Sequence, residues 1–201
     1  MLRALLIDLD GVIRLWNPAI DLKAEQATGL PAGALRQAAF APDLLHAAIT
    51  GQILDKHWRQ QVVERLRQKF PAVNVAKTVR LWSASSGEID QAVLPLVRTC
   101  REKVKVVLVT NATSRLYSDL ALLGIEDEFD HIINSSVVGY CKPHPEIFHA
   151  ALADVGVTAD EAFFVDDSAD NVAVANQLGI ASHLYRGISV LKEELWRYDL
   201  L

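Results

Sequence analysis

The sequence predicts an α/β fold: a Rossmann-like parallel sheet with helices on both faces and a helical segment inserted after the first strand. Three observations lead to this fold class. Short apolar runs alternate with helix-like segments over the second half of the chain, which is typical of parallel strands joined by crossover helices. One more apolar run opens the chain. Between that run and the others, from Arg14 to Gly87, there is no convincing strand.

The predicted strands are five short runs rich in Val, Ile, Leu and Phe, as buried strands usually are. They are Ala4–Leu9, Val104–Thr110, His131–Ser135, Ala162–Val165 and Ile180–Leu184. Apolar residues at helical spacing predict that the segments between the later runs are helices. Phe148 and Leu152, for example, share one face of a helix that Pro145 is placed to begin. We therefore expect a sheet domain made of residues 1–14 and 88–201.

The inserted stretch, residues 15–87, predicts a helical cap domain. Four helix-start signals lie within it, at Asn17-Pro18, Pro31, Pro42 and Asp55. Apolar side chains recur at every fourth residue at Trp58, Val62, Leu66 and Phe70, which predicts an amphipathic helix. Connections of this length are rarely structureless, so we expect the insertion to form a small domain over the carboxyl end of the first strand.

Composition narrows the class of protein. The chain is 51% hydrophobic and 22% charged, a balance typical of a folded globular protein. Its net charge of −5 argues against nucleic acid or an anionic membrane as the main partner. No apolar run approaches the roughly 20 residues that cross a bilayer. With two cysteines and no recognisable export signal, we expect a cytoplasmic monomer or homodimer with free thiols.

Two carboxylates and a glycine follow the first predicted strand, in the order Asp8-Leu9-Asp10-Gly11. The apolar run ends at these residues, and we expect both carboxylates to converge on one centre where the strand breaks into a loop. Gly11 supplies the backbone freedom for that break. Because open parallel sheets bind ligands at the carboxyl ends of their strands, we expect Asp8 and Asp10 to do chemistry.

Three later motifs also follow strands or rigid turns. Thr110-Asn111 ends the second strand just before a helix, where free N–H groups suit an anion; the alternative is an ordinary helix cap. Lys142 precedes two prolines and is a candidate partner for a phosphate or carboxylate; the alternative is a solvated surface lysine.

The last motif is Asp166-Asp167, which ends an apolar strand as the first motif does. Adjacent carboxylates there repel one another unless a cation or hydrogen bonds compensate. Together with Asp8 and Asp10 they form an all-oxygen cluster, which suits Mg²⁺. Helix capping by Asp167 is the competing interpretation, but two strands that both end in paired acids favour a common site.

These four motifs, in this order, closely resemble those of the haloacid dehalogenase-like superfamily. The stretch from Gly51 to Asn111 resembles a narrower branch, which includes sugar-phosphate phosphatases and the N-terminal phosphatase domain of soluble epoxide hydrolases. The resemblance implies a Mg²⁺-dependent phosphatase that acts on a small phosphorylated metabolite, for example a sugar phosphate. It implies Asp8 as the nucleophile that forms an aspartyl-phosphate, and Asp10 as the acid and base.

The resemblance also implies the ligands. Mg²⁺ would be held by the Asp8 side chain, the Asp10 backbone carbonyl and Asp167. Asp166 would either be a further ligand or hydrogen-bond to one of the ligands. The transferring phosphoryl oxygens would be bound by three groups. These are Thr110, the Asn111 amide and Lys142.

Other interpretations remain at this point. Relatives that displace halide lack the second acid, so Asp10 favours phosphoryl transfer. A phosphomutase would need a cationic cluster in the cap for a second phosphate, and none is evident in the sequence. A phospho-accepting signalling domain and a non-catalytic binding protein are further alternatives. In the cap, His57 and Arg59 fit solvated positions better than substrate contacts, and Trp16 suits either the site entrance or packing.

Overall fold

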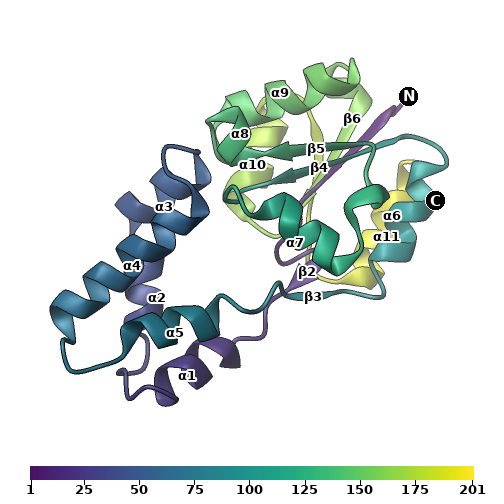
Figure 1. The fold of residues 1–201 in the computed structure, drawn as a ribbon. Coiled ribbons are helices and arrows are strands. Elements are labelled where there is room, and N and C mark those ends of the chain that lie inside the picture. Colours follow the sequence, from purple (N-terminus) through teal and green to yellow (C-terminus); the bar gives the residue numbers. More distant parts are fainter.

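The computed structural model describes residues 1–201 and contains a five-stranded parallel sheet, which confirms the predicted fold class (Figure 1). The strand order is β5-β4-β1-β6-β7. The strands are β1 (Ala4–Ile7), β4 (Lys105–Thr110), β5 (His131–Asn134), β6 (Ala162–Asp166) and β7 (Ala181–Leu184). β1 is the central strand and pairs in parallel with β4 and β6, so the chain beyond it emerges at the middle of the sheet's carboxyl edge.

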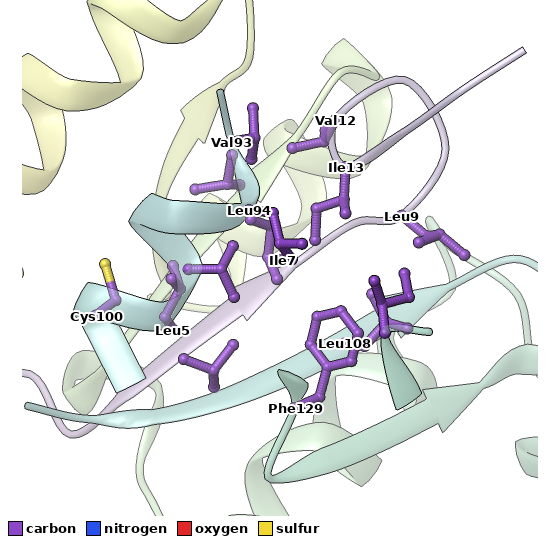
Figure 2. Packing of buried hydrophobic residues seen from close by; sticks show 14 of the residues in the cluster. Leu5, Ile7, Leu9, Val12, Ile13, Val93, Leu94, Cys100, Leu108 and Phe129 are labelled. Carbon is purple, nitrogen blue, oxygen red and sulfur yellow. The ribbon is translucent and has the colours of Figure 1, made fainter. Parts of the chain in front are cut away.

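Helices cover both faces of the sheet. They are α6 (Leu94–Arg101), α7 (Leu116–Leu123), α8 (Ser135–Val138), α9 (Pro145–Val155), α10 (Ala169–Gln177) and α11 (Ile188–Arg197), with 3-10 turns at Glu126–Glu128 and Ala159–Glu161. Leu5 and Ile7 of β1 pack on one face against α6, α7 and α11 in a cluster of 21 buried residues (Figure 2). Ala4 and Leu6 point to the opposite face, toward α9 and α10. This alternation explains why the predicted strand is apolar throughout.

Five helices form a separate layer beside the sheet, between its first and second strands in the sequence (Figure 1). They are α1 (Ala19–Gln26), α2 (Ala34–Ala39), α3 (Pro42–Ile49), α4 (Asp55–Lys69) and α5 (Val75–Trp82). Their apolar faces meet in a cluster of 11 buried residues, all between Ala24 and Val79. Trp58, Val62 and Leu66 are buried on α4 as the spacing predicts. Phe70 lies one residue beyond the end of that helix and is only partly buried.

The two ends of this helical layer meet in a short antiparallel ribbon. β2 (Arg14–Leu15) pairs with β3 (Glu88–Ile89), in the register Arg14 with Ile89. The expectation that the stretch from Arg14 to Gly87 contains no strand is therefore wrong at its first edge, where β2 lies, whereas β3 begins just beyond Gly87. Two-residue strands are too short to leave a periodic pattern, which is why the sequence does not reveal them. No helix in the molecule combines the length and the apolar character needed to traverse a bilayer.

Candidate active site

The predicted site residues converge because three neighbouring strands end at one edge of the sheet. β1 lies between β4 and β6, so Asp8 emerges between Thr110, the last residue of β4, and Asp166, the last residue of β6. β1 ends at Ile7, two residues earlier than the sequence suggests, and the Asp8 N–H donates to the carbonyl of Val165 at 2.9 Å. The chain turns after that bond, which places the Asp8 carboxylate over the strand ends.

Lys142 reaches this edge from the segment between α8 and α9. Its ammonium group donates three hydrogen bonds of 2.7 Å, to Asp8 Oδ1, Asp166 Oδ2 and the carbonyl of Val109. The Lys142 side chain is 1% exposed. The alternative of a solvated surface lysine is therefore wrong, and this cation is built into the site.

Asn111 holds Lys142 in place. Its side-chain oxygen accepts a hydrogen bond from the Lys142 N–H at 2.7 Å, and its amide nitrogen donates to the Lys142 carbonyl at 2.9 Å. Both ends of this side chain are thus engaged with the backbone of the residue that carries the ammonium. In this arrangement the Asn111 side chain positions Lys142.

The charges at this edge do not balance. Three carboxylates, Asp8, Asp166 and Asp167, lie with one oxygen of each within 4.8 Å of the others, against the single Lys142 ammonium. Burial raises the pKa of Asp8 to about 7, with the Lys142 ammonium opposing the shift and the Asp166 carboxylate adding to it. Burial also disfavours the Lys142 cation, but the two carboxylates outweigh it and raise the pKa of Lys142 above its ordinary value.

An oxygen-rich cluster with excess negative charge fits a divalent cation. Asp166 is the least available of its members, since Oδ1 accepts from the Ser168 N–H at 2.8 Å and Oδ2 accepts from Lys142. Asp167 is exposed. Partial shielding of its carboxyl from water, together with the charge of the neighbouring Asp166, nevertheless raises its pKa. Asp8 and Asp167 are thus the carboxylates best placed to bind a metal ion.

Gly11 makes room for Asp167. Its φ is +82°, and a Cβ at this position would lie 2.1 Å from Asp167 Oδ2. An L side chain is therefore excluded twice, by the left-handed backbone and by the carboxylate. The glycine predicted to break the strand also lets the first and last acidic motifs approach each other.

Asp10 lies apart from this cluster. Arg14 donates to its two carboxylate oxygens, from Nε at 2.6 Å and from Nη2 at 3.0 Å, and Trp16 Nε1 donates at 2.7 Å. The Asp10 carboxylate lines a cavity beneath the inserted helices, whereas Asp8 faces Lys142. The two aspartates of the first motif thus serve neighbouring but different parts of the site.

Thr110 carries an unpartnered polar group. The residue is 1% exposed, and its Oγ1 is buried without a hydrogen-bond partner. Buried hydroxyls almost always have a hydrogen-bond partner. This unpartnered hydroxyl lies at the end of β4, next to Val109, whose carbonyl binds Lys142. We therefore expect an oxygen atom of a ligand to bind here.

Two residues of the site were missed by the sequence reasoning. Arg14 is 4% exposed although it is charged, and only its spacing of four residues from Asp10 hinted at a pair. Asn171, in the first turn of α10, places Nδ2 3.0 Å from both oxygens of Asp166. Its position five residues after that acid gives no signal in one sequence. Of the cap residues, Arg59 lines the cavity, which the sequence disfavoured, and His57 is exposed.

Comparisons with known proteins place the chain in a family. A family model described as haloacid dehalogenase-like hydrolase matches residues 2–179. Bifunctional epoxide hydrolase 2 of Sus scrofa is 26% identical over 96% of this chain, which spans only 38% of that longer protein. Sesquiterpene phosphatase of Aspergillus oryzae is 25% identical, over 95% of this chain and 94% of its own length. Phosphoglycolate phosphatase of Pectobacterium atrosepticum is 28% identical, over 90% and 79%.

A solved structure extends the agreement to three dimensions. A haloacid dehalogenase family enzyme from Bacteroides thetaiotaomicron, in complex with magnesium and inorganic phosphate, superposes with a TM-score of 0.74. It is 26% identical, and the match covers 91% of this chain and 93% of that one. The family model, which matches most of the chain, establishes the family. This chain belongs to the haloacid dehalogenase-like hydrolase family.

Proposed function

We propose that this hydrolase is a Mg²⁺-dependent phosphatase that cleaves a small phosphorylated metabolite through an aspartyl-phosphate on Asp8. The observation that carries the proposal is a cluster of three carboxylates, two of them bound to one buried ammonium, beside the orphan hydroxyl of Thr110. Such a site suits phosphoryl transfer, in which catalysis is mostly positioning and neutralisation of charge. The magnesium and phosphate in the related enzyme's structure support the same chemistry.

Asp8 is oriented for attack. Its Oδ1 accepts both the Leu9 N–H and the Lys142 ammonium, each at 2.7 Å, so Oδ2 remains for other partners. In the proposed first step an Asp8 oxygen attacks phosphorus, and the bond between phosphorus and the leaving oxygen breaks. Lys142 and the Thr110 hydroxyl would hold the phosphoryl oxygens. Mg²⁺ bound by Asp8 and Asp167 would neutralise charge on those oxygens and on the carboxylates.

Asp10 would carry the protons. It would donate one to the leaving oxygen in the first step and take one from water in the second, when that water attacks phosphorus and frees Asp8 and inorganic phosphate. In the structure its carboxylate is occupied by Arg14 and Trp16. We therefore propose that the substrate's leaving oxygen replaces one of these partners as it binds.

The helical layer would act as a cap over this site. We propose residues 15–87 as that domain, because its buried cluster is its own and its two ends meet in the β2–β3 ribbon. The cap touches the sheet domain at the Asp55 side chain, which accepts from the Thr113 hydroxyl at 2.9 Å. A lid of this kind would exclude water and select the substrate.

Hydrolysis of p-nitrophenyl phosphate by the purified protein, with Mg²⁺ and with excess EDTA, tests the proposal. We expect activity only with the metal and none in Asp8→Asn. Asp10→Asn should lose roughly 10² to 10⁴ in kcat, whereas Asp199→Asn, fully exposed, should be unaffected. Acid quenching during turnover should yield an Asp8 peptide heavier by one phosphoryl group. Full activity in Asp8→Asn would refute the assignment.

A further inference from the structure

A cavity of about 390 Å³ lies between the inserted helices and the carboxyl edge of the sheet. Asp10 and Asn111 line its inner end, and α2, α3, α4 and α5 supply residues to its outer wall. This volume is within the range of small-molecule sites. Because Asp10 would protonate the leaving oxygen, the alcohol part of the substrate would extend from Asp10 into this cavity.

The charges that line the cavity cancel in pairs. Four arginines and four aspartates contribute to the lining, and no lysine, histidine or glutamate does. Each arginine lies within salt-bridge distance of one of these aspartates. The pairs are Arg14–Asp10 at 2.6 Å, Arg36–Asp21 at 3.5 Å, Arg59–Asp55 at 2.8 Å and Arg115–Asp119 at 2.7 Å. Any cation that a second anionic group could meet in the cavity is therefore already paired with a carboxylate, although Arg14 Nη1 and Arg59 Nε have no hydrogen-bond partner of their own.

Three of the five amide and hydroxyl side chains of the lining are also engaged within the protein, whereas Asn17 and Ser85 each accept one backbone N–H and keep their donors free. The Asn111 side chain binds the Lys142 backbone at both ends, the Thr113 hydroxyl donates to Asp55, and the Ser83 hydroxyl donates to the Val79 carbonyl at 2.7 Å. Few groups remain to pair with the hydroxyls of a sugar, and a buried hydroxyl without a partner is costly.

Aromatic and aliphatic side chains supply the rest of the wall. Phe40, Trp58 and Trp82 pack edge to face, with ring centroids 5.5 to 6.4 Å apart. Trp58 Nε1 already donates to the Ala39 carbonyl at 3.0 Å, so this ring offers the cavity an apolar surface. Phe40 is 40% exposed although it lines the cavity, which leaves ring surface for a ligand to cover.

We infer that the substrate is the phosphate monoester of an uncharged, apolar alcohol, and not a sugar phosphate, a bisphosphate or a carboxylated ester. The inference rests on the proposed phosphatase activity and narrows its substrate class. The ring or branched chain of the alcohol packs against Phe40, Trp58 and Trp82, and burial of that surface supplies most of the affinity beyond the phosphate. The same neutral lining argues against a phosphomutase, which needs a second phosphate site.

Two matched pairs of substrates test this inference through kcat/KM. Cyclohexylmethyl phosphate and glucose 6-phosphate differ chiefly in hydroxyl groups, and hexyl phosphate differs from 6-(phosphonooxy)hexanoate by a terminal carboxylate. We expect the apolar member of each pair to be preferred by roughly tenfold or more, mainly through KM. If both polar members are hydrolysed as well as their partners, the inference is wrong and the phosphatase assignment stands. If no ester is hydrolysed, p-nitrophenyl phosphate included, the proposed function itself fails.

Variants locate the preference in the cavity. Phe40→Ala should lower kcat/KM for cyclohexylmethyl phosphate by about tenfold and kcat/KM for glucose 6-phosphate by much less. Trp196→Ala, at an exposed aromatic residue that does not line the cavity, should change neither. Asp55→Asn should release the Arg59 charge into the cavity and raise kcat/KM for the carboxylated ester several-fold. Equal losses on both substrates in Phe40→Ala, or no gain in Asp55→Asn, would overturn the inference.

Discussion

Asp8→Asn should raise the stability of the metal-free protein even though it removes the proposed nucleophile. The ordinary pKa of the carboxyl is 3.8, and burial raises it to about 7 in the folded chain. The folded chain therefore binds the Asp8 proton more tightly than the unfolded chain does. The stability that this group contributes is fully present below about pH 4 and is lost as the pH rises through about 7.

The size of the effect follows from that shift. One pKa unit corresponds to about 1.4 kcal/mol, so the ionised Asp8 carboxylate destabilises the fold by roughly 4 kcal/mol above pH 8. At pH 5 the folded carboxyl is still protonated while the unfolded one is ionised, and the cost is roughly 2 kcal/mol. Asparagine does not titrate. The advantage of Asp8→Asn should therefore grow by roughly 2 to 3 kcal/mol between pH 5 and pH 8.

Urea unfolding of both proteins in EDTA, at intervals of one pH unit from 5 to 8, measures this difference. Asp130→Asn is the matched control, because its burial is outweighed by the Val106 N–H, Arg101 and Lys105, which hold its pKa below the ordinary value. That variant should lose stability at pH 8. A difference between Asp8→Asn and wild type that stays constant with pH would refute the electrostatic account. Saturating Mg²⁺ should reduce the difference by stabilising the wild type.

Three further outcomes are expected. Gly11→Ala should bind Mg²⁺ more weakly in calorimetry, because the new Cβ would displace Asp167. The control is Gly29→Ala, where φ is similar at +74° and the surrounding space is open. That variant should lose only folding stability, by about 1 to 2 kcal/mol. Thr110→Val should weaken inhibition by inorganic phosphate without destabilising the metal-free fold in thermal unfolding, since its hydroxyl has no partner there. Cys100, whose pKa burial raises to about 11, should resist iodoacetamide at pH 8 until urea unfolds the chain, as peptide mass spectrometry would show.

The convergence of the proposed catalytic residues was predictable because it depends on strand ends. Asp8, Thr110 and Asp166 each follow a short apolar run, and the carboxyl ends of neighbouring parallel strands must share an edge. Lys142 was less certain from the sequence, since nothing local shows that the segment before α9 folds back under β4. Its burial depends on Asn111, which fixes the Lys142 backbone from 31 residues away. A contact over that distance leaves no periodic trace.

The direction of Asp10 was not predictable. A single residue separates it from Asp8, and the sequence suggested that both carboxylates face one centre. The turn at Gly11 and the β2 strand bring Arg14 back beside Asp10, so the second carboxylate points to the cavity. Which way a side chain points after a strand ends depends on the φ and ψ angles of the turn, and these follow from packing as well as from residue type.

The ion pairs of the cavity show how much of the site can be predicted from local spacing in the sequence. Three of its four ion pairs join residues four apart in the sequence: Asp10 with Arg14, Asp55 with Arg59 and Arg115 with Asp119. That spacing is readable, and on helices it often brings opposite charges together. What the spacing does not reveal is that all three pairs border the same space, because that depends on how α4 packs over the loop that follows β4. A cavity whose charges are paired is thus a property of tertiary packing built from charges whose pairing is local, and the substrate class proposed above depends on both.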